Sequence, residues 1–257
     1  MKVGFFDSGI GGITVLNTAI KMIPEADYIY YADTENVPYG TKSKKEVKSY
    51  VFKAVEFLID CEIDALVIAC NTATSIAVKA LRSKYSVPII GMEPAVKPAV
   101  ERVKQKKVLV TATPLTIKED KFHNLVKTIG ATGIVDALAL PKLVDFAEDF
   151  IFSKNIINSY LKEKLADYNL KEYGTLVLGC THFSFYKSFF KELLPNNIEV
   201  IDGNYGTVRH LKNRLIEREI IVNKQRKGKG ELTFYSNREK KNKILKKYLR
   251  ILDKYNV

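Results

Sequence analysis

Two apolar runs, 110 residues apart, each end on a cysteine that is followed by small polar residues. Leu66–Ile68 leads to Cys70, and Leu176–Leu178 leads to Cys180, with His182 two residues further on. Free cysteine is among the most buried residue types, so packing alone would explain one such residue. Two thiols in matched contexts instead favour a pair facing one site. Such a pair suits a reaction that needs acid/base groups on opposite faces of a substrate.

The residues beside each cysteine bear on its reactivity. A free thiol has a pKa near about 8.5, and only its thiolate is a strong base or nucleophile. Both cysteines are expected at a strand end before a helix, where the positive helix N-terminus favours the thiolate. His182 and a carboxylate such as Asp7 are candidates to exchange a proton with a neighbouring thiol. The alternative, that both cysteines are small core residues, stays open on this pattern.

The elements that must position these residues alternate between strands and helices. Strands are expected at 2–6, 28–32, 87–92, 107–110 and 231–235 and in the two cysteine runs, and helices from 13, near 44–59, 74–85, 119–127, 143–168 and 238–252, and after 205. Near-continuous apolar strands in this alternation indicate parallel sheets covered by helices on both faces. The sequence therefore predicts an α/β protein with two similar domains. Residues 1–97 plus 205–257 form the first, and residues 98–204 are inserted as the second.

The polar residues of interest follow the ends of the expected strands. In open α/β sheets, ligands bind beyond the carboxyl ends of the strands. At those ends stand Asp7, Ser8, Asp33, Cys70, Asn71, Thr113, Cys180 and His182. Two such edges facing each other would form an interdomain cleft, where we expect the active site.

The residues at the same edges differ in how well they match known ligand-binding and metal-binding patterns. The run Gly9–Gly12 lacks the third glycine of a dinucleotide fingerprint, with Thr14 in its place, so nucleotide binding is weakly supported. Its backbone N–H groups are still suited to hold a carboxylate. Compact hydrogen-bonding side chains that would grip a small zwitterion are Asn71, Thr72, Thr116 and Thr181. The C-x-H spacing at Cys180 matches no usual zinc pattern, so no metal site is expected.

Charge and composition limit the classes of function. The net charge is +12, but residues 224–254 alone carry twelve Lys/Arg against three Asp/Glu. These lysines suit the solvated face of an amphipathic helix, and no nucleic-acid motif accompanies them, so a nucleic-acid partner is disfavoured. No apolar run is long enough for a membrane span, and the amino terminus does not resemble a signal peptide. Three scattered cysteines form no disulfide framework, so we expect a cytoplasmic protein with reduced thiols.

Four motifs together point to a family. Asp7–Gly12, the stretch from Tyr31 to Gly40, Ala69–Ala73 and Gly179–His182 resemble glutamate racemase, of the aspartate/glutamate racemase superfamily, in the family's order. Phe234-Tyr235 and the helix after it resemble the family's carboxyl end, so the resemblance spans essentially the whole chain. It implies two α/β domains with the site between them. It also implies an isomerase that supplies D-glutamate for peptidoglycan and needs no metal, PLP or nucleotide.

The resemblance also implies residue roles. Cys70 would act on the D enantiomer with Asp7 tuning it, and Cys180 would act on the L enantiomer with His182 and Glu148 assisting. The loop over the substrate would be formed by Asp33, Pro38, Tyr39 and Gly40. Contacts to the substrate carboxylate and ammonium would come from Ser8, Asn71, Thr72, Thr116 and Thr181, with Thr113 a further candidate at its strand end. A homodimer is also implied.

The motifs do not decide the substrate. A racemase of the same superfamily that acts on aspartate or hydantoin is the alternative. Three departures from the usual family pattern bear on substrate fit and loop geometry: Leu115 beside Thr116, Phe183-Ser184 after His182, and Gly203 in the segment that opens the last part of the chain. None removes a proposed proton carrier.

Overall fold

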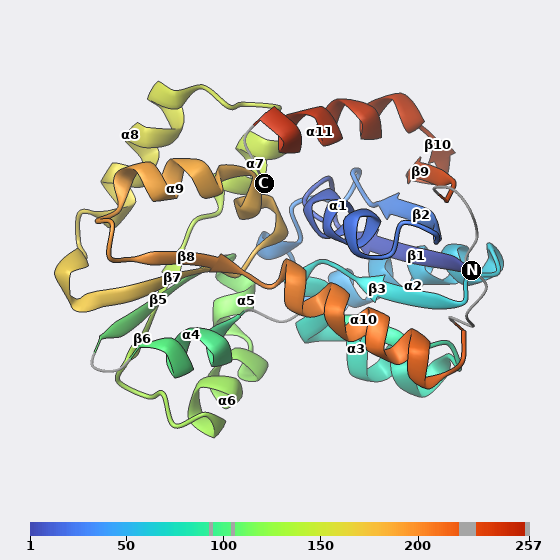
Figure 1. The fold of residues 1–257 in the computed structure, drawn as a ribbon, viewed down its shortest axis with the longest axis horizontal. Coiled ribbons are helices and arrows are strands. Elements are labelled where there is room, and N and C mark those ends of the chain that lie inside the picture. Colours follow the sequence, from blue (N-terminus) through green and yellow to red (C-terminus); the bar gives the residue numbers. More distant parts are fainter. Residues whose placement is uncertain (93–94, 104–105, 221–229, 255–257) are drawn as a thin grey trace.

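The computed structural model describes residues 1–92, 95–103, 106–220 and 230–254. These residues form two sheets that lie side by side, each covered by helices (Figure 1). The chain is therefore α/β with mostly parallel sheets, which confirms the predicted fold class. The part containing the larger sheet is called the first half below, and the part containing the smaller sheet is called the second half.

The first half has six strands in the order β10-β9-β2-β1-β3-β4. The strands are β1 (Lys2–Asp7), β2 (Asp27–Ala32), β3 (Ala65–Ile68), β4 (Ile89–Gly91), β9 (Leu232–Ser236) and β10 (Glu239–Lys240). All neighbouring pairs are parallel except β10 with β9. The predicted strand over 231–235 thus pairs with β2, although about 200 residues separate them in the sequence.

Helices cover both faces of this sheet because its strands are apolar on both sides. Val3 and Phe5 of β1 pack in the same core as α1 (Ile13–Met22) and α10 (Asn204–Glu217), whereas Phe6 packs with α2 (Lys44–Asp60) and α3 (Asn71–Lys84). Successive side chains of a strand point to opposite faces, which explains this division. The last helix is α11 (Asn242–Lys254). It buries Leu245, Tyr248 and Leu252 in the core that also contains α1, and its lysines face outward, as predicted.

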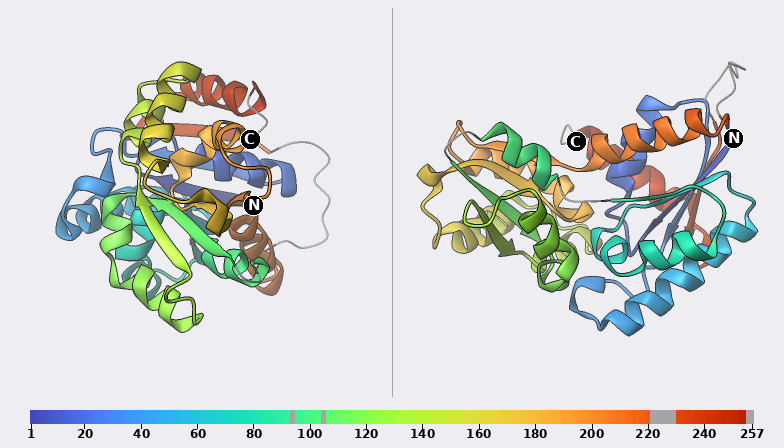
Figure 2. Two further views of the ribbon diagram at one scale, coloured as in Figure 1. Left: turned by 90° about the vertical axis from the view of Figure 1, so that its left-hand side faces the viewer. Right: turned by 90° about the horizontal axis from the view of Figure 1, so that it is seen from below.

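The second half has four parallel strands in the order β6-β5-β7-β8. They are β5 (Lys107–Ala112), β6 (Val135–Ala139), β7 (Tyr173–Leu178) and β8 (Glu199–Asp202). One face is covered by α4 (Val96–Arg102) and α6 (Asp120–Thr128), and the other by α7 (Lys142–Glu148), α8 (Lys154–Leu165) and α9 (Lys187–Leu193). Figure 2 shows the two halves from two further sides. The exact domain boundaries near residues 98 and 204 stay a prediction.

Several predicted elements differ from those observed. The single helix expected over 143–168 is two helices, because α7 ends at Glu148 and Phe150 has a left-handed φ of 61°. The N–H of Ile151 bonds to Phe146 O and that of Phe150 to Ala147 O, which is a Schellman ending without glycine. The final helix begins at residue 242 rather than 238 because a short hairpin forms β10 first. Strands β6 and β8 were not predicted.

Candidate active site

Cys70 lies where β3 passes into α3. It is the N-cap of α3, and its Sγ accepts a hydrogen bond from the N–H of Ala73 at 3.4 Å. Helix α3 starts at residue 71, three residues earlier than predicted. Cys70 thus lies at a helix N-terminus, as predicted. The side chain is buried, and Ser8 Oγ lies 3.6 Å from the sulfur.

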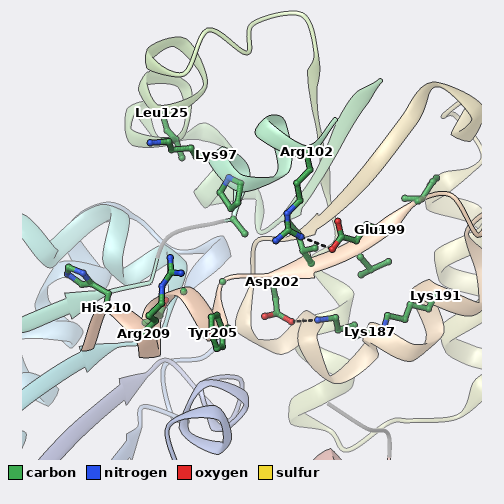
Figure 3. Close-up of a pocket in the computed structure, with 18 of the residues that line it drawn as sticks. Lys97, Arg102, Leu125, Lys187, Lys191, Glu199, Asp202, Tyr205, Arg209 and His210 are labelled. Carbon is green, nitrogen blue, oxygen red and sulfur yellow. Dashed lines mark hydrogen bonds and ion pairs between the residues drawn. The ribbon is translucent and has the colours of Figure 1, made fainter. Parts of the chain in front are cut away.

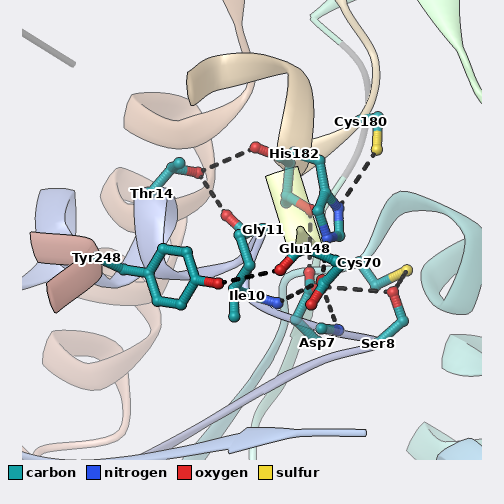
Figure 4. Close-up of polar contacts among 12 residues, drawn as sticks. Asp7, Ser8, Ile10, Gly11, Thr14, Cys70, Glu148, Cys180, His182 and Tyr248 are labelled. Carbon is teal, nitrogen blue, oxygen red and sulfur yellow. Dashed lines mark hydrogen bonds and ion pairs between the residues drawn. The ribbon is translucent and has the colours of Figure 1, made fainter. Parts of the chain in front are cut away.

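Cys180 follows β7 in the second half and is buried as well. The segment after it, η3 (Thr181–Tyr186), is a 3-10 helix rather than an α-helix, so the expected α-helix N-terminus is missing at this cysteine. Its Sγ lies 3.8 Å from His182 Nδ1, a contact visible in Figure 4. The histidine therefore takes the place of the helix end as the positive neighbour of this thiol.

Asp7 ends β1 and is fully buried. Its Oδ1 accepts from Gly9 N at 3.0 Å and from Ser8 Oγ at 3.4 Å, and its Oδ2 accepts from Thr181 Oγ1 at 3.0 Å. Burial raises the pKa of this carboxyl to about 6, against the lowering effect of His182 and of the hydrogen bonds. A carboxyl with this pKa changes its charge near neutral pH, which is the range where proton transfer needs it.

The buried His182 pairs with the partly buried Glu148 in the second half. His182 Nε2 lies 2.6 Å from Glu148 Oε1, and the same oxygen accepts from the N–H of Ile10 at 2.9 Å. Burial lowers the pKa of His182, but hydrogen bonds to Cys180 and Glu148 outweigh burial and raise it well above its ordinary value. The pair therefore presents a protonated imidazole to the Cys180 sulfur.

The two thiols differ in their surroundings. Burial, and then the charge of Asp7, raise the pKa of Cys70 to about 12, although hydrogen bonds from Ala73 and Ser8 lower it. This is opposite to the expectation that the helix N-terminus would make Cys70 a thiolate. The burial of the sulfur outweighs the helix end because the thiolate is removed from water. Cys70 is therefore a protonated thiol until a base accepts its proton.

The two halves exchange hydrogen bonds at the site. Thr181 of the second half donates to Asp7 of the first, and Ile10 of the first half donates to Glu148 of the second. Gly9 and Ile10 use the backbone N–H groups that were expected to hold a substrate carboxylate. These two donors hold carboxylates of the protein itself, which corrects that expectation.

Three threonine hydroxyls form a closed triangle near Cys70. Thr72 Oγ1 lies 3.0 Å from Thr113 Oγ1 and 2.9 Å from Thr116 Oγ1, and Thr113 lies 2.9 Å from Thr116. Thr72 is on α3, whereas Thr113 is the N-cap of α5 (Pro114–Lys118) and Thr116 lies in its first turn, so the triangle also joins the two halves. Asn71 beside them has a buried Oδ1 with no hydrogen-bond partner, so an acceptor is available there.

The loop after β2 approaches the second half. Tyr39 donates from its hydroxyl to Asp33 Oδ2 at 2.5 Å, and Asn36 donates to Asp33 Oδ1 at 2.8 Å. Pro38 follows a cis peptide bond. A Cβ at Gly40 would lie 2.5 Å from Thr113 Cβ, so glycine allows this loop to touch the threonine triangle.

The structure thus gathers most of the candidates in one place. Asp7, Ser8, Cys70, Glu148, Cys180, Thr181 and His182 form a connected group (Figure 4), and the triangle and the loop flank it. Sequence reasoning missed Ile10, Thr14, Tyr30 and Tyr248. Thr14 donates toward Thr181 O, Tyr248 toward Glu148 O, and Tyr30 to Gly9 O. Each of these four residues makes a hydrogen bond that involves a backbone atom, so the residue types alone do not predict these contacts.

The described residues also line two cavities that do not contain the thiols. One, of about 1170 Å³, lies between the halves near α10 and β8, with Arg102 paired to Glu199 and Lys187 paired to Asp202 on its wall (Figure 3). The other, of about 230 Å³, borders the site through Asn71 and Thr116. Within the described ranges, no group of three or more His, Cys, Asp or Glu is arranged to hold a metal ion. In the same ranges no helix has the length and apolarity needed to cross a membrane.

Comparison with known proteins agrees with this geometry. The family model "Asp/Glu/Hydantoin racemase" matches residues 14–211. A glutamate racemase from Halothermothrix orenii is 61% identical over 252 residues, which is 98% of this chain and 99% of the relative. A Bacillus anthracis glutamate racemase structure, RacE1, has a TM-score of 0.82 at 31% identity, covering 91% of this chain and 87% of that one. One from Francisella tularensis, solved with D-glutamate, has a TM-score of 0.79 at 30% identity, with coverage of 91% and 87%.

The fold and these similarities define an amino-acid racemase, a type of isomerase. Within that class, the chain belongs to the Asp/Glu/hydantoin racemase family and, inside it, to the glutamate racemases.

Proposed function

We propose that the protein interconverts L- and D-glutamate by proton transfer between two thiols, without a cofactor. The observation that carries the proposal is that each thiol has its own acid/base group. Asp7 reaches Cys70 through Ser8, and the Glu148–His182 pair reaches Cys180. The names of the relatives support glutamate as substrate rather than aspartate or hydantoin, which is the alternative within the family.

The proposed reaction begins from D-glutamate at Cys70. Asp7 accepts the thiol proton, and the Cys70 thiolate then removes the α-proton, leaving the electron pair of the C–H bond on the α-carbon. The Cys180 thiol delivers a proton to the opposite face, which gives L-glutamate and a Cys180 thiolate. Protonated His182 stabilises that thiolate. The reverse reaction uses the same groups in the opposite order.

The flanking groups are proposed to hold the substrate. The acceptor Oδ1 of Asn71 suits the α-ammonium group, and the hydroxyls of Ser8 and Thr181 and of the threonine triangle suit the carboxylates. Asp33, Pro38, Tyr39 and Gly40 form the loop that covers it. The thiols must remain reduced, so the proposed location is the cytoplasm, where thiols are kept reduced. A role in supplying D-glutamate for peptidoglycan and a homodimeric state are carried over from the family resemblance.

Single substitutions of the two cysteines test the mechanism. Cys70→Ser and Cys180→Ser should each lower the racemisation rate at least about a hundredfold, because each removes the proton carrier of one face. Serine keeps the N-cap of α3 at residue 70, so folding should be unaffected. The assay is run in D₂O from each enantiomer, with circular dichroism for inversion and NMR for deuterium at the α-carbon. Near wild-type racemisation by either variant would refute the two-thiol mechanism.

The same assay decides the substrate. We expect solvent deuterium to enter glutamate and not aspartate or a hydantoin. Incorporation into aspartate with none into glutamate would show that the alternative is correct.

A further inference from the structure

A buried phenol lies against residues 9–12, called the glycine turn below. Tyr30, on β2, is fully buried, and its ring stacks on Phe234 with 5.4 Å between the ring centroids. Its hydroxyl donates to Gly9 O at 2.8 Å, and it also lies against Gly12. One side chain from a neighbouring strand therefore bonds to one end of the glycine turn and packs against the other.

The glycine turn in turn holds one acid/base group for each thiol. Gly9 N donates to Asp7 Oδ1 at 3.0 Å, and Ile10 N donates to Glu148 Oε1 at 2.9 Å. That Glu148 oxygen is the one that contacts His182 Nε2 at 2.6 Å. A shift of the turn by even part of an ångström would therefore misalign acid/base groups on both sides of the site.

The packing around the phenol leaves no room for a side chain at Gly12. A Cβ at Gly12 would lie 2.8 Å from the Tyr30 hydroxyl and 2.8 Å from Asp7 Cβ. Burial, and then the charges of Asp7, Glu148 and Cys70, raise the pKa of Tyr30 well above its ordinary value. The phenol therefore keeps its proton at any working pH and remains a hydrogen-bond donor.

We propose that Tyr30 is a positioning residue that aligns the acid/base groups of both thiols through the glycine turn. The inference rests on the two-thiol function proposed above. It assigns Tyr30 no contact with the substrate. Its effect passes through the hydrogen bond to Gly9 O and the close packing against Gly12.

The strand supplies a matched control. Tyr28 stands two residues earlier, points to the same face of β2 and is also buried. Its hydroxyl donates to Ala19 O at 2.9 Å and Ile23 O at 2.7 Å, at the end of α1, away from the glycine turn. Tyr28→Phe and Tyr30→Phe thus each remove one buried hydroxyl that is bonded to backbone.

The experiment compares both variants with the wild type in the glutamate assay. Tyr30→Phe should lower kcat/KM about ten- to a hundredfold, with kcat reduced from both enantiomers, because misplacing reacting groups is costly. Tyr28→Phe should change kcat/KM less than about twofold. Thermal unfolding should lose a similar amount of stability in both variants, since each leaves buried backbone groups unpaired.

The pH profile separates positioning from a loss of stability. Asp7 faces Gly9 N, Ser8 and Cys70 in its own half and Thr181, His182 and Glu148 in the other. The Gly9 N–H bond lowers the pKa of Asp7, so loosening the turn should raise that pKa. The acid limb of kcat/KM should therefore move to higher pH in Tyr30→Phe only.

Two outcomes would overturn the inference: kcat/KM of Tyr30→Phe within about twofold of Tyr28→Phe, or an acid limb that does not move. Either would leave the two-thiol function standing, provided that Cys70→Ser and Cys180→Ser are inactive. A wild-type protein that does not racemise glutamate would instead remove the proposed function itself.

Discussion

The Asp7 carboxyl is electrostatically costly to the fold. Its pKa is raised to about 6 by burial, whereas an aspartate in an unfolded chain titrates near about 3.9. The folded state therefore binds the proton more tightly than the unfolded state. The stabilisation that comes from binding this proton is present below about pH 3.9 and is lost as the pH rises through about 6.

Asp7→Asn should for this reason stabilise the protein at high pH while removing activity. An amide can still accept from Gly9 N and can donate to the Thr181 hydroxyl, so the buried contacts survive. We expect the free energy of unfolding in urea to rise by about 1–3 kcal/mol at pH 8 and to match the wild type near pH 4. Racemisation at pH 8 should fall at least about a hundredfold. An equal loss of stability at both pH values would contradict the burial cost assigned to this carboxylate.

Residue types and their positions in the sequence predicted part of the site but not all of it. Cys70, Cys180, Asp7 and His182 could be singled out because each stands at a strand end, where the fold class places ligands. Glu148 was indicated by the family resemblance alone, because nothing in residues 143–168 marks a helix end. The high pKa of Cys70 was not predictable, since it depends on how completely the fold buries the sulfur.

At the scale of elements, the glycine turn approaches η3 closely. A Cβ at Gly11 would lie 2.4 Å from His182 Nδ1, 2.5 Å from Thr181 Oγ1 and 2.7 Å from the backbone nitrogen of His182. A side-chain rotation cannot relieve contact with a backbone atom. The two segments must therefore move apart if any larger residue replaces this glycine.

Gly11→Ala should accordingly lower kcat/KM at least about tenfold, because it displaces η3 and with it the histidine of Cys180. Gly206→Ala is the control, since Gly206 is exposed on α10 and a Cβ there meets nothing within 4 Å. That change should leave kcat/KM unaltered and raise the free energy of unfolding by about 0.5–1 kcal/mol. Wild-type activity in Gly11→Ala would show that η3 tolerates the shift.

The order of elements was predicted better than their ends. Apolar strands of β1, β2, β3 and β7 were found because both faces of each are buried. β6 lies at a sheet edge and is only half-buried, so its pattern is weak. The break after Glu148 depends on a phenylalanine in a left-handed conformation, where a glycine would have been the usual sign.

At the scale of the whole molecule, one ion pair joins the two halves beside the site. Lys44, at the start of α2, lies 3.1 Å from Glu119, whose side chain is 7% exposed and whose Oε1 has no hydrogen-bond partner. The pair lies at the same junction as the contact between Gly40 and Thr113. It therefore favours the arrangement in which the loop after β2 is closed.

Lys44→Met and Glu119→Gln should both raise KM several-fold with little change in kcat, since closure and not chemistry is affected. In a double-mutant cycle the two changes should couple by about 1 kcal/mol in urea unfolding. The control cycle uses Arg102 and Glu199, an exposed pair within the second half, which should couple by about 0.5 kcal/mol or less and leave KM unchanged. If KM changes no more in the Lys44 and Glu119 variants than in the Arg102 and Glu199 variants, the role given to Lys44 is wrong.

The exchange of hydrogen bonds between the halves has a consequence for selectivity. Asp7 is held by Thr181 of the opposite half, and Glu148 is held by Ile10 of the opposite half. Separating the halves would undo both contacts together, so in an open molecule each of these carboxylates loses the hydrogen bond that the opposite half supplies. Under the proposed mechanism, we expect proton abstraction only from ligands small enough to let the halves meet around them. Bulky amino acids that enter the open form would leave with their configuration intact.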